Sequence, residues 1–431
     1  MRRITVQIVS LVLAASLFTG CSVANTASDT PGASGGAVSG SVAAEDEEIE
    51  PAGRNQSYME NSDNRYDTLY DEDEDEDGCI LAQYRLDGTL VKKIKLKEDG
   101  EISWVTDEWL YYTAEDIREN DILWRIPIKK TAKGDRLLTD KKEKVLKAWS
   151  IDIDYITDTY IIAEIWDGKK EHDGVCKYEL GSGKLTPLIP YSDEEDEAEC
   201  LWTSEYPIMW QGELFFEGLD EVYLLDPEKE QVSSICPLGG SEDLDDCALT
   251  GNEFYFLINN KLYQYNCSSK KLKCVIPEKE FLKEVRKLKL GRVGEIYIDE
   301  MYLNQGRLYF FTDVLWTGKD ANSKKELSYN KDELFSVAID DLEGIRHEDK
   351  LMDYLDKKGK YENSEWGREN GMPACHTSWL DDAVDGKIVA AYQKGKENCR
   401  YVLYDLQTGE IEDMAEDKML KEYKEYYNLY D

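Results

Sequence analysis

Short apolar runs recur along the chain, and most follow a turn signal such as Gln211-Gly212 or Asp385-Gly386. After each comes a second run in which apolar and polar residues alternate, and this period of two is typical of half-buried strands. The first runs are 110–112, 160–162, 214–216, 254–256, 308–310 and 387–389. The second runs are 122–128, 175–180, 222–225, 261–265, 334–339 and 401–406, with a seventh of the same kind at 80–86. The pattern predicts a chain of short antiparallel strands.

Groups of four such strands, repeated about every 40 to 55 residues, are typical of β-propeller blades. We therefore predict an all-β fold, a single β-propeller of about seven four-stranded blades over residues 66–414. The recurring order of turn, aromatic pair, loop and Leu-Tyr-x-Tyr strand, as at 262–265, resembles the low-density-lipoprotein-receptor-like propeller of bacterial lipoproteins, a domain of unknown function. That resemblance implies a fold and no activity. Two packed β-sandwich domains are the alternative, because they also have evenly spaced strands.

A few stretches do not fit the repeat. Residues 278–290 have apolar side chains at positions i, i+4 and i+7, which predicts an amphipathic helix between two blades. Residues 313–333 and 341–378 are long polar insertions, the second with a helix-like apolar patch, and we expect recognition loops or disorder there. Residues 415–431 predict a C-terminal helix that either docks a partner through its tyrosines or packs on the propeller.

The N-terminus has the pattern of a signal peptide, because Arg2 and Arg3 precede an apolar run at 4–18 that is short for a membrane span. The run ends Leu-Phe-Thr-Gly-Cys at 17–21, which resembles the lipobox of bacterial lipoproteins. That resemblance implies cleavage after residue 20, a lipid on Cys21, and anchorage at the extracytoplasmic face of the bacterial cell membrane. An ordinary secretory signal with a chance cysteine is the alternative.

The segment that follows has the composition of a linker. Ser, Ala, Gly and Thr dominate residues 22 to 44, and an acidic run at 45–50 comes next. Such a composition cannot build a core, so we predict a disordered tether over residues 21–65 between the lipid and the propeller.

Charge narrows the choice of partners. The chain has 52 Lys and Arg against 90 Asp and Glu, a net charge of −38. This field repels nucleic acid and anionic membranes, so nucleic-acid binding is excluded as a function class.

On a propeller template, many acidic clusters fall in loops that emerge on one face, including those at 98–101, 115–121 and 152–154. A face of this kind attracts a cationic ligand or a basic protein partner, although acidic residues also simply keep a protein soluble. The residues predicted for the acidic binding face are Asp193, Glu194, Glu195, Asp196, Glu242, Asp243, Asp245 and Asp246.

Asp73, Asp75 and Asp77 match the start of a calcium loop, in which alternate carboxylates converge on one ion. The closing ligands of such a loop are missing, because its ninth and twelfth positions are Leu81 and Tyr84. Ca²⁺ is the one cofactor for which the chain offers a pattern, and this pattern is incomplete.

The cysteines permit a disulfide. Cys267 and Cys274 flank a turn at 268–273, so we predict that they pair across a hairpin, as an extracytoplasmic location allows. Buried free thiols are the alternative.

Catalytic patterns are missing from the sequence. His172, His347 and His376 lie far apart and lack the spacing of zinc ligands or of a catalytic triad. With 90 carboxylates in the chain, a pair at glycosidase spacing arises by chance. We therefore expect a binding or scaffolding propeller. The alternative is a carbohydrate-active hydrolase or lyase that uses carboxylates at the top of the propeller.

Overall fold

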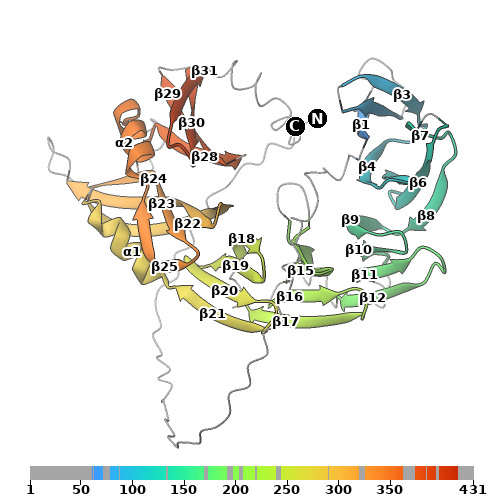
Figure 1. The fold of residues 1–431 in the computed structure, drawn as a ribbon, viewed down its shortest axis with the longest axis horizontal. Coiled ribbons are helices and arrows are strands. Elements are labelled where there is room, and N and C mark those ends of the chain that lie inside the picture. The colour runs from blue at the N-terminus through green and yellow to red at the C-terminus, as the bar shows by residue number, and fades with distance from the viewer. Residues whose placement is uncertain are drawn as a thin grey trace, which may run out of the picture. The chain divides into compact units, whose positions relative to one another are not determined.

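The computed structural model describes residues 61–415, apart from 62, 71–77, 87, 133, 169–172, 192–197, 203–206, 219–220, 239–243, 290, 320–325, 363–373, 385 and 395–397. Almost all of the secondary structure is antiparallel strand, grouped into seven sheets that follow one another along the chain (Figure 1). The predicted β-propeller class is confirmed. Neither helix in the described ranges has the length and apolar character that crossing a bilayer requires.

The first three sheets cover the N-terminal part of the described chain. Sheet 1 contains β1 (Asn64–Tyr70), β2 (Cys79–Arg85) and β3 (Leu90–Lys95). Sheet 2 contains β4 (Gly100–Val105), β5 (Trp109–Glu115), β6 (Asp121–Lys130), β7 (Arg136–Leu138) and β8 (Glu143–Lys147). Sheet 3 contains β9 (Ser150–Ile156), β10 (Tyr160–Trp166), β11 (Gly174–Glu179) and β12 (Leu185–Pro190).

The other four sheets follow in the same order. Sheet 4 contains β13 (Ala198–Cys200), β14 (Met209–Trp210), β15 (Glu213–Gly218), β16 (Glu221–Asp226) and β17 (Gln231–Pro237). Sheet 5 contains β18 (Leu244–Thr250), β19 (Glu253–Ile258), β20 (Lys261–Asn266) and β21 (Lys271–Ile276). Sheet 6 contains β22 (Arg292–Asn304), β23 (Arg307–Lys319), β24 (Glu326–Ala338), β25 (Asp341–His347), β26 (Tyr361–Glu362) and β27 (Ala374–His376). Sheet 7 contains β28 (Ser378–Val384), β29 (Lys387–Lys394), β30 (Asn398–Asp405) and β31 (Ile411–Ala415).

Strands that are neighbours in sequence are mostly neighbours in a sheet, as in the order β9-β10-β11-β12. In sheets 2 to 7 the first apolar runs form the second strand of each sheet, and the alternating runs form the third. These two central strands carry most of the core, and in sheets 2 to 6 both of their faces meet a neighbouring sheet. The first strand of each of these sheets lies at a sheet edge.

Apolar clusters join each sheet to the next one along the chain in the described part of the fold. Between sheets 4 and 5, for example, the rings of Phe215 and Phe254 are both fully buried and stack with their centroids 4.1 Å apart. Burial of a phenylalanine side chain contributes about 1.5–3 kcal/mol. The sheets are thus held together mainly by apolar packing between their faces.

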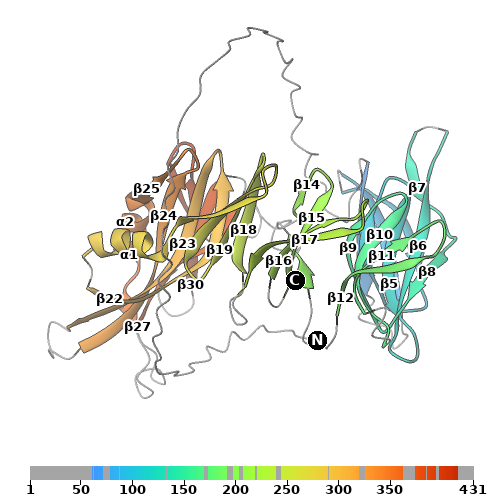
Figure 2. The ribbon, with the colours of Figure 1, turned by 90° about the horizontal axis from the view of Figure 1, so that it is seen from below.

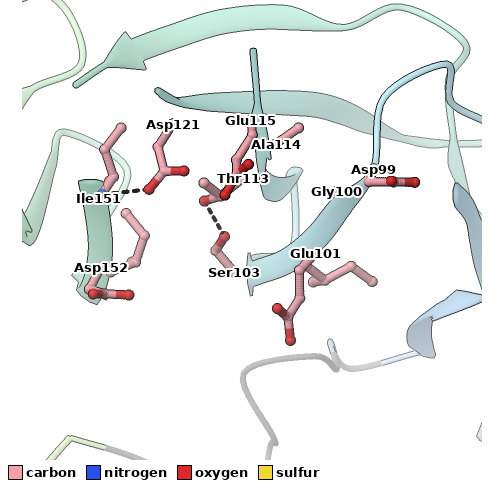
Figure 3. Close-up of a pocket in the computed structure, with 12 residues that line it drawn as sticks. Asp99, Gly100, Glu101, Ser103, Thr113, Ala114, Glu115, Asp121, Ile151 and Asp152 are labelled. Carbon is pink, nitrogen blue, oxygen red and sulfur yellow. Dashed lines mark hydrogen bonds between the residues drawn. The ribbon is translucent and has the colours of Figure 1, made fainter. Parts of the chain in front are cut away.

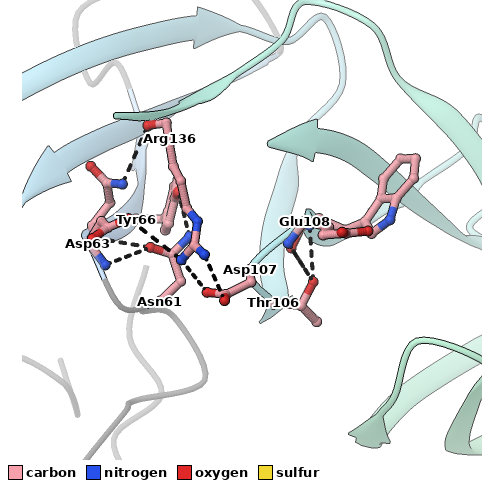
Figure 4. Close-up of polar contacts among 9 residues, drawn as sticks. Asn61, Asp63, Tyr66, Thr106, Asp107, Glu108 and Arg136 are labelled. Carbon is pink, nitrogen blue, oxygen red and sulfur yellow. Dashed lines mark hydrogen bonds and ion pairs between the residues drawn. The ribbon is translucent and has the colours of Figure 1, made fainter. Parts of the chain in front are cut away.

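Polar contacts add to the junction between sheets 1 and 2 (Figure 4). The Arg136 guanidinium donates to both carboxylate oxygens of Asp107, with Nη2 2.8 Å from Oδ2, and lies 3.6 Å from Asp63. The backbone oxygen of Arg136 accepts a hydrogen bond of 2.7 Å from the fully buried Gln83 amide. One arginine of β7 therefore connects the two sheets through its side chain and its backbone.

Two helices lie beside sheet 6. Helix α1 (Glu278–Lys287), labelled in Figure 2, is the amphipathic helix predicted at 278–290, and it contacts β22 and β25. Its buried Phe281 packs edge-on against Phe310. Helix α2 (Asp349–Lys358) contains the apolar patch predicted within 341–378 and packs against sheet 7 through the buried Leu351 and Leu355.

The expectation of a polar loop at 313–333 was wrong for most of that stretch. Its described residues continue the hairpin of β23 and β24, with Val314 paired to Lys331 in an unbroken register. The prediction failed because the short apolar run from Val314 to Trp316, whose two end residues are almost fully buried, is flanked on both sides by polar residues that reduce the average hydropathy of the segment.

The two ends of the predicted propeller can be placed only in part. Strand β1 begins at Asn64 and β31 ends at Ala415, close to the predicted limits of 66 and 414. The predicted signal peptide, Cys21, nearly all of the tether at 21–65, and residues 416–431 of the predicted C-terminal helix lie outside the described residues.

Candidate functional site

The first strands of five sheets each contain a β-bulge. Apart from a second bulge at Gly294 in β22, one residue is skipped in the pairing register of each of these strands, and a bulge of this kind re-aims the side chains around it. The skipped residues are Ser103, Asp154, Asp245, Asp299 and Asp381. Four of the five are aspartates, so the bulges place carboxylates along the first-strand edges of the sheets.

Two partly buried carboxylates close to these bulges have structural roles. Asp246 Oδ2 in sheet 5 accepts a hydrogen bond of 2.5 Å from the Met301 backbone N–H in sheet 6. Asp332 Oδ2 in sheet 6 accepts one of 2.8 Å from the Leu380 backbone N–H in sheet 7. Burial raises the pKa of Asp246 to about 6 and that of Asp332 to about 7, although both hydrogen bonds act in the opposite direction. These two carboxylates therefore join neighbouring sheets.

A pocket of about 620 Å³ lies between the first strands of sheets 2 and 3 (Figure 3). Residues at the start of β4, at the end of β5, at the start of β6 and in the first half of β9 line it. None of the lining residues that the structure describes is basic. The lining carboxylates are those of Asp99, Glu101, Glu115, Asp121 and Asp152.

Hydrogen bonds between strands fix the walls of the pocket. Asp121 Oδ2 accepts a hydrogen bond of 2.8 Å from the Ile151 backbone N–H, which joins β6 to β9. The hydroxyls of Ser103 and Thr113 lie 2.7 Å apart between β4 and β5. At one end, Asp99 Oδ1 accepts a hydrogen bond of 2.8 Å from the Gly78 backbone N–H. The pocket is therefore formed by residues held on rigid strands and their turns.

The electrostatics of the pocket favour a cation. Partial burial raises the pKa of Asp121, and the neighbouring carboxylates of Glu115 and Asp152 raise it further, against the hydrogen bond from Ile151. The smaller part of this rise, from Glu115 and Asp152, reflects repulsion between the negative charges of the pocket. A positively charged ligand would relieve the repulsion, because opposite charges within a few ångströms favour the ionised carboxylates.

A single metal ion fits this geometry poorly. Across the described chain, no three His, Cys, Asp or Glu side chains are close enough together to hold one metal ion. The carboxylates of the pocket are spread around its wall, so the arrangement suits a ligand that carries several separated positive charges.

Only two residues of the predicted acidic binding face belong to the described chain. Asp245 and Asp246 lie on β18, at the first-strand edge of sheet 5. The other six predicted residues of that face lie outside the described residues: Asp193, Glu194, Glu195, Asp196, Glu242 and Asp243. Asp73, Asp75 and Asp77 of the calcium-like pattern also lie outside them. By contrast, the structure brings together in one pocket the acidic stretches at 98–101, 115–121 and 152–154.

The predicted pairing of Cys267 with Cys274 is wrong, because both thiols are free. Cys274 lies opposite Tyr263 in the register of β20 and β21, whereas Cys267 lies beyond the end of β20. Cys267 is buried and Cys274 is exposed. The hairpin turn is shorter than the predicted turn at 268–273, and this difference moves the two side chains out of register.

The sequence analysis missed a group of acidic residues on the first strands of sheets 6 and 7. Asp299 and Glu300 follow Ile298, and Asp381 and Asp382 follow Leu380, at the same bulge position as Asp245 and Asp246 after Leu244. The signal that could have found them is an apolar residue followed by two acidic residues, which recurs in the first strands of sheets 5, 6 and 7. Among 90 acidic residues this pattern is hard to recognise without the register.

Comparisons with known proteins place the chain in no family. No protein-family model matches it, and no curated protein matches it. Among solved structures, oligopeptidase B from Leishmania major is 10% identical with a TM-score of 0.43, covering 81% of this chain and 47% of its own. A prolyl endopeptidase is 12% identical with a TM-score of 0.40, covering 79% of this chain and 46% of its own. A nidogen–laminin complex is 8% identical with a TM-score of 0.29, covering 69% of this chain and 91% of its own.

The chain thus spans about half the length of the two peptidases that it resembles. At these TM-scores and identities the similarities carry no argument about activity or ligand. What is established is the fold, and the chain is a β-propeller whose function has to be argued from its own residues.

Proposed function

We propose that the protein is a binding β-propeller, held at the extracytoplasmic face of a bacterial membrane by a lipid on Cys21, that takes a cationic ligand in its acidic pocket. The observation that carries the binding proposal is the lining of that pocket, which has five carboxylates and no basic side chain among its described residues. The anchoring proposal rests on the lipobox-like sequence at 17–21.

The ligand class follows from the shape and charge of the site. Amines on a flexible chain can each approach a different carboxylate, whereas a compact inorganic cation can contact few of them. Polyamines and lysine-rich peptides have the required chemistry. Their binding should weaken as salt is added, because charges at an open pocket are screened over about 10 Å at 0.1 M salt.

A titration with tetralysine tests the pocket. Glu101→Gln, Glu115→Gln and Asp152→Asn together remove three negative charges from the wall, and we expect the affinity for tetralysine to fall at least tenfold. The matched control removes three exposed acids elsewhere, through Asp158→Asn, Glu343→Gln and Glu410→Gln, and should change the affinity little. Equal losses in both variants would mean that net charge alone attracts the peptide, and the pocket would then have no special role.

Cell fractionation tests the anchor separately. Cys21→Ala removes the only thiol that the lipobox-like sequence offers for lipidation, so the variant should leave the membrane fraction. The control is Cys274→Ala, which removes an exposed thiol far from the lipobox-like sequence. Equal membrane association of wild type and Cys21→Ala would exclude lipid anchorage without affecting the proposal for the pocket.

A further inference from the structure

Two large apolar side chains are exposed at the rim of the acidic pocket. Ile117, in the loop between β5 and β6, is fully exposed, and Trp149, between β8 and β9, is 63% exposed. Their loops continue directly into residues that line the pocket, since Glu115 and Asp121 bound the first loop and Ile151 follows the second. Exposed apolar side chains grouped beside a polar site are typical of interaction surfaces.

The two loops are tied to each other. Asp116 forms an ion pair with Lys147 at the end of β8, and its Oδ1 also accepts a hydrogen bond of 2.8 Å from the Arg118 backbone N–H. The Ala148 backbone N–H donates to the Asp121 carbonyl oxygen at 3.1 Å. The Lys147 charge is therefore balanced by Asp116, and the loops that carry Ile117 and Trp149 are held next to the pocket.

The Trp149 indole is also held in place. The backbone N–H of Trp149 donates a hydrogen bond of 2.7 Å to the Trp166 carbonyl oxygen. The ring lies against Gly168, because a Cβ atom at that position would be 2.6 Å from two ring carbons. Gly168 has a φ of +74°, which favours glycine, so the chain gives the ring a flat surface on one side. More than half of the side chain is still open to solvent, so an ordered aromatic group is available for contact.

We propose that this rim is the docking surface for a basic peptide segment of a partner protein that also carries apolar side chains. Lysine or arginine side chains of the segment enter the acidic pocket, and a neighbouring apolar side chain packs on Trp149 and Ile117. Charge complementarity selects a basic partner, and an ordered tryptophan beside a charged pocket supplies the kind of contact that dominates binding at protein interfaces. This inference rests on the function proposed for the pocket. It adds the requirement that the ligand carries an apolar side chain next to its basic ones.

The test compares tetralysine with the hexapeptide Lys-Leu-Lys-Lys-Leu-Lys, which carries the same number of lysines. We expect the hexapeptide to bind roughly tenfold more tightly, because part of a leucine side chain is removed from water against the rim. Trp149→Ala should abolish this preference and leave the affinity for tetralysine unchanged. Ile117→Ser should reduce the preference, and its full exposure means that folding is not at risk. Leu86→Ser, at a remote position that is 61% exposed, is the control and should change neither affinity.

Four results would overturn the inference, and the last of them would also overturn the proposed function. If wild type bound both peptides with equal affinity, the rim would have no apolar contact with the ligand. The proposed function of the pocket would still stand, because both peptides would bind. A preference that survives in Trp149→Ala would place the apolar contact elsewhere. Trp149-dependent binding to neutral phosphatidylcholine vesicles, without a preference for the hexapeptide, would assign the rim to a membrane surface instead. Failure of both peptides to bind would defeat the proposed function of the pocket itself.

Discussion

The carboxylate of Asp121 in sheet 2 accepts a hydrogen bond of 2.8 Å from the backbone N–H of Ile151 in sheet 3. This contact joins two consecutive sheets at the wall of the acidic pocket. The same side chain therefore holds the sheets together and contributes negative charge to the pocket. The two roles are separable, because an amide oxygen can accept the hydrogen bond without carrying the charge.

We expect Asp121→Asn to unfold at or slightly above the wild-type temperature, because it keeps an acceptor for Ile151 and removes repulsion from Glu115 and Asp152. Asp121→Ala should lose about 1–3 kcal/mol of unfolding free energy, since the Ile151 N–H loses its partner. Both variants should bind tetralysine more weakly. Thermal unfolding with parallel binding titrations checks this, and a similar loss of stability in both variants would show that the charge itself holds the sheets together.

A second prediction concerns His347, which connects β25 to α2. Its Nε2 lies 2.8 Å from Glu333 Oε2 and its Nδ1 lies 2.6 Å from Asp349 Oδ1. A neutral imidazole can donate from only one nitrogen, so two carboxylate contacts favour the charged ring. Burial lowers the pKa of His347, but the hydrogen bonds to Glu333 and Asp349 outweigh it, and the net shift is upward.

The folded protein therefore binds this proton more tightly than the unfolded chain does. The stabilisation from His347 is fully present below the unfolded pKa of about 6.5 and is lost as the pH rises through the higher folded value. His347→Gln should lower the unfolding temperature most at about pH 5.5 and least at about pH 8.5. His376→Gln is the control, and its effect on the unfolding temperature should have the opposite pH dependence, because burial and Lys331 lower the pKa of His376. A pH-independent effect of His347→Gln would show that the ring is not charged in the folded protein.

Asp154 offers a prediction about stability. It is the bulged residue of β9, only 4% exposed, and its Oδ2 has no hydrogen-bond partner among the described residues. Burial raises its pKa well above the usual range, and the carboxylates of Glu164, Asp152 and Glu199 raise it further. The wild type therefore loses stability as the pH rises above the unfolded pKa of about 3.9.

Asp154→Asn removes the charge, so it should unfold at a higher temperature than wild type at pH 7, and the gap should close near pH 4. The matched control is Asp152→Asn on the same strand, where the side chain is exposed and the change in stability should be small. Unfolding curves at several pH values check the prediction. A variant less stable than wild type at neutral pH would mean that the Asp154 carboxylate has a favourable partner.

The sequence predicted the strands well because their signal is local. The alternating runs at 222–225 and 261–265 became β16 and β20, since period-two patterning records which side of a strand faces a neighbouring sheet. The helix at 278–290 was found for a similar reason, because Phe281 and Val285 pack on one side of α1. Blade number and strand order then followed from the repeat.

The site was harder to predict because it depends on register and on contacts between sheets. Glu101, Asp121 and Asp152 were recognised as parts of acidic stretches, but the sequence offers no way to know that their three strands line one pocket. The local pattern around Asp299 and Asp381, an apolar residue followed by two acidic residues, does not by itself identify the bulges, because a bulge is a property of a strand and its partner together. The same limit explains the wrong pairing of Cys267 with Cys274.

The most direct test of the central claim is to find which carboxylates touch a bound cation. Tetralysine can be coupled to the protein with a carbodiimide, which joins an amine to a carboxylate in direct contact, and the joined residues can be identified by mass spectrometry. We predict coupling mainly at Glu101, Glu115 and Asp152, which salt should suppress. Coupling spread evenly over remote exposed acids such as Glu343 and Glu410, with none concentrated at the pocket, would contradict the claim that this pocket is the binding site.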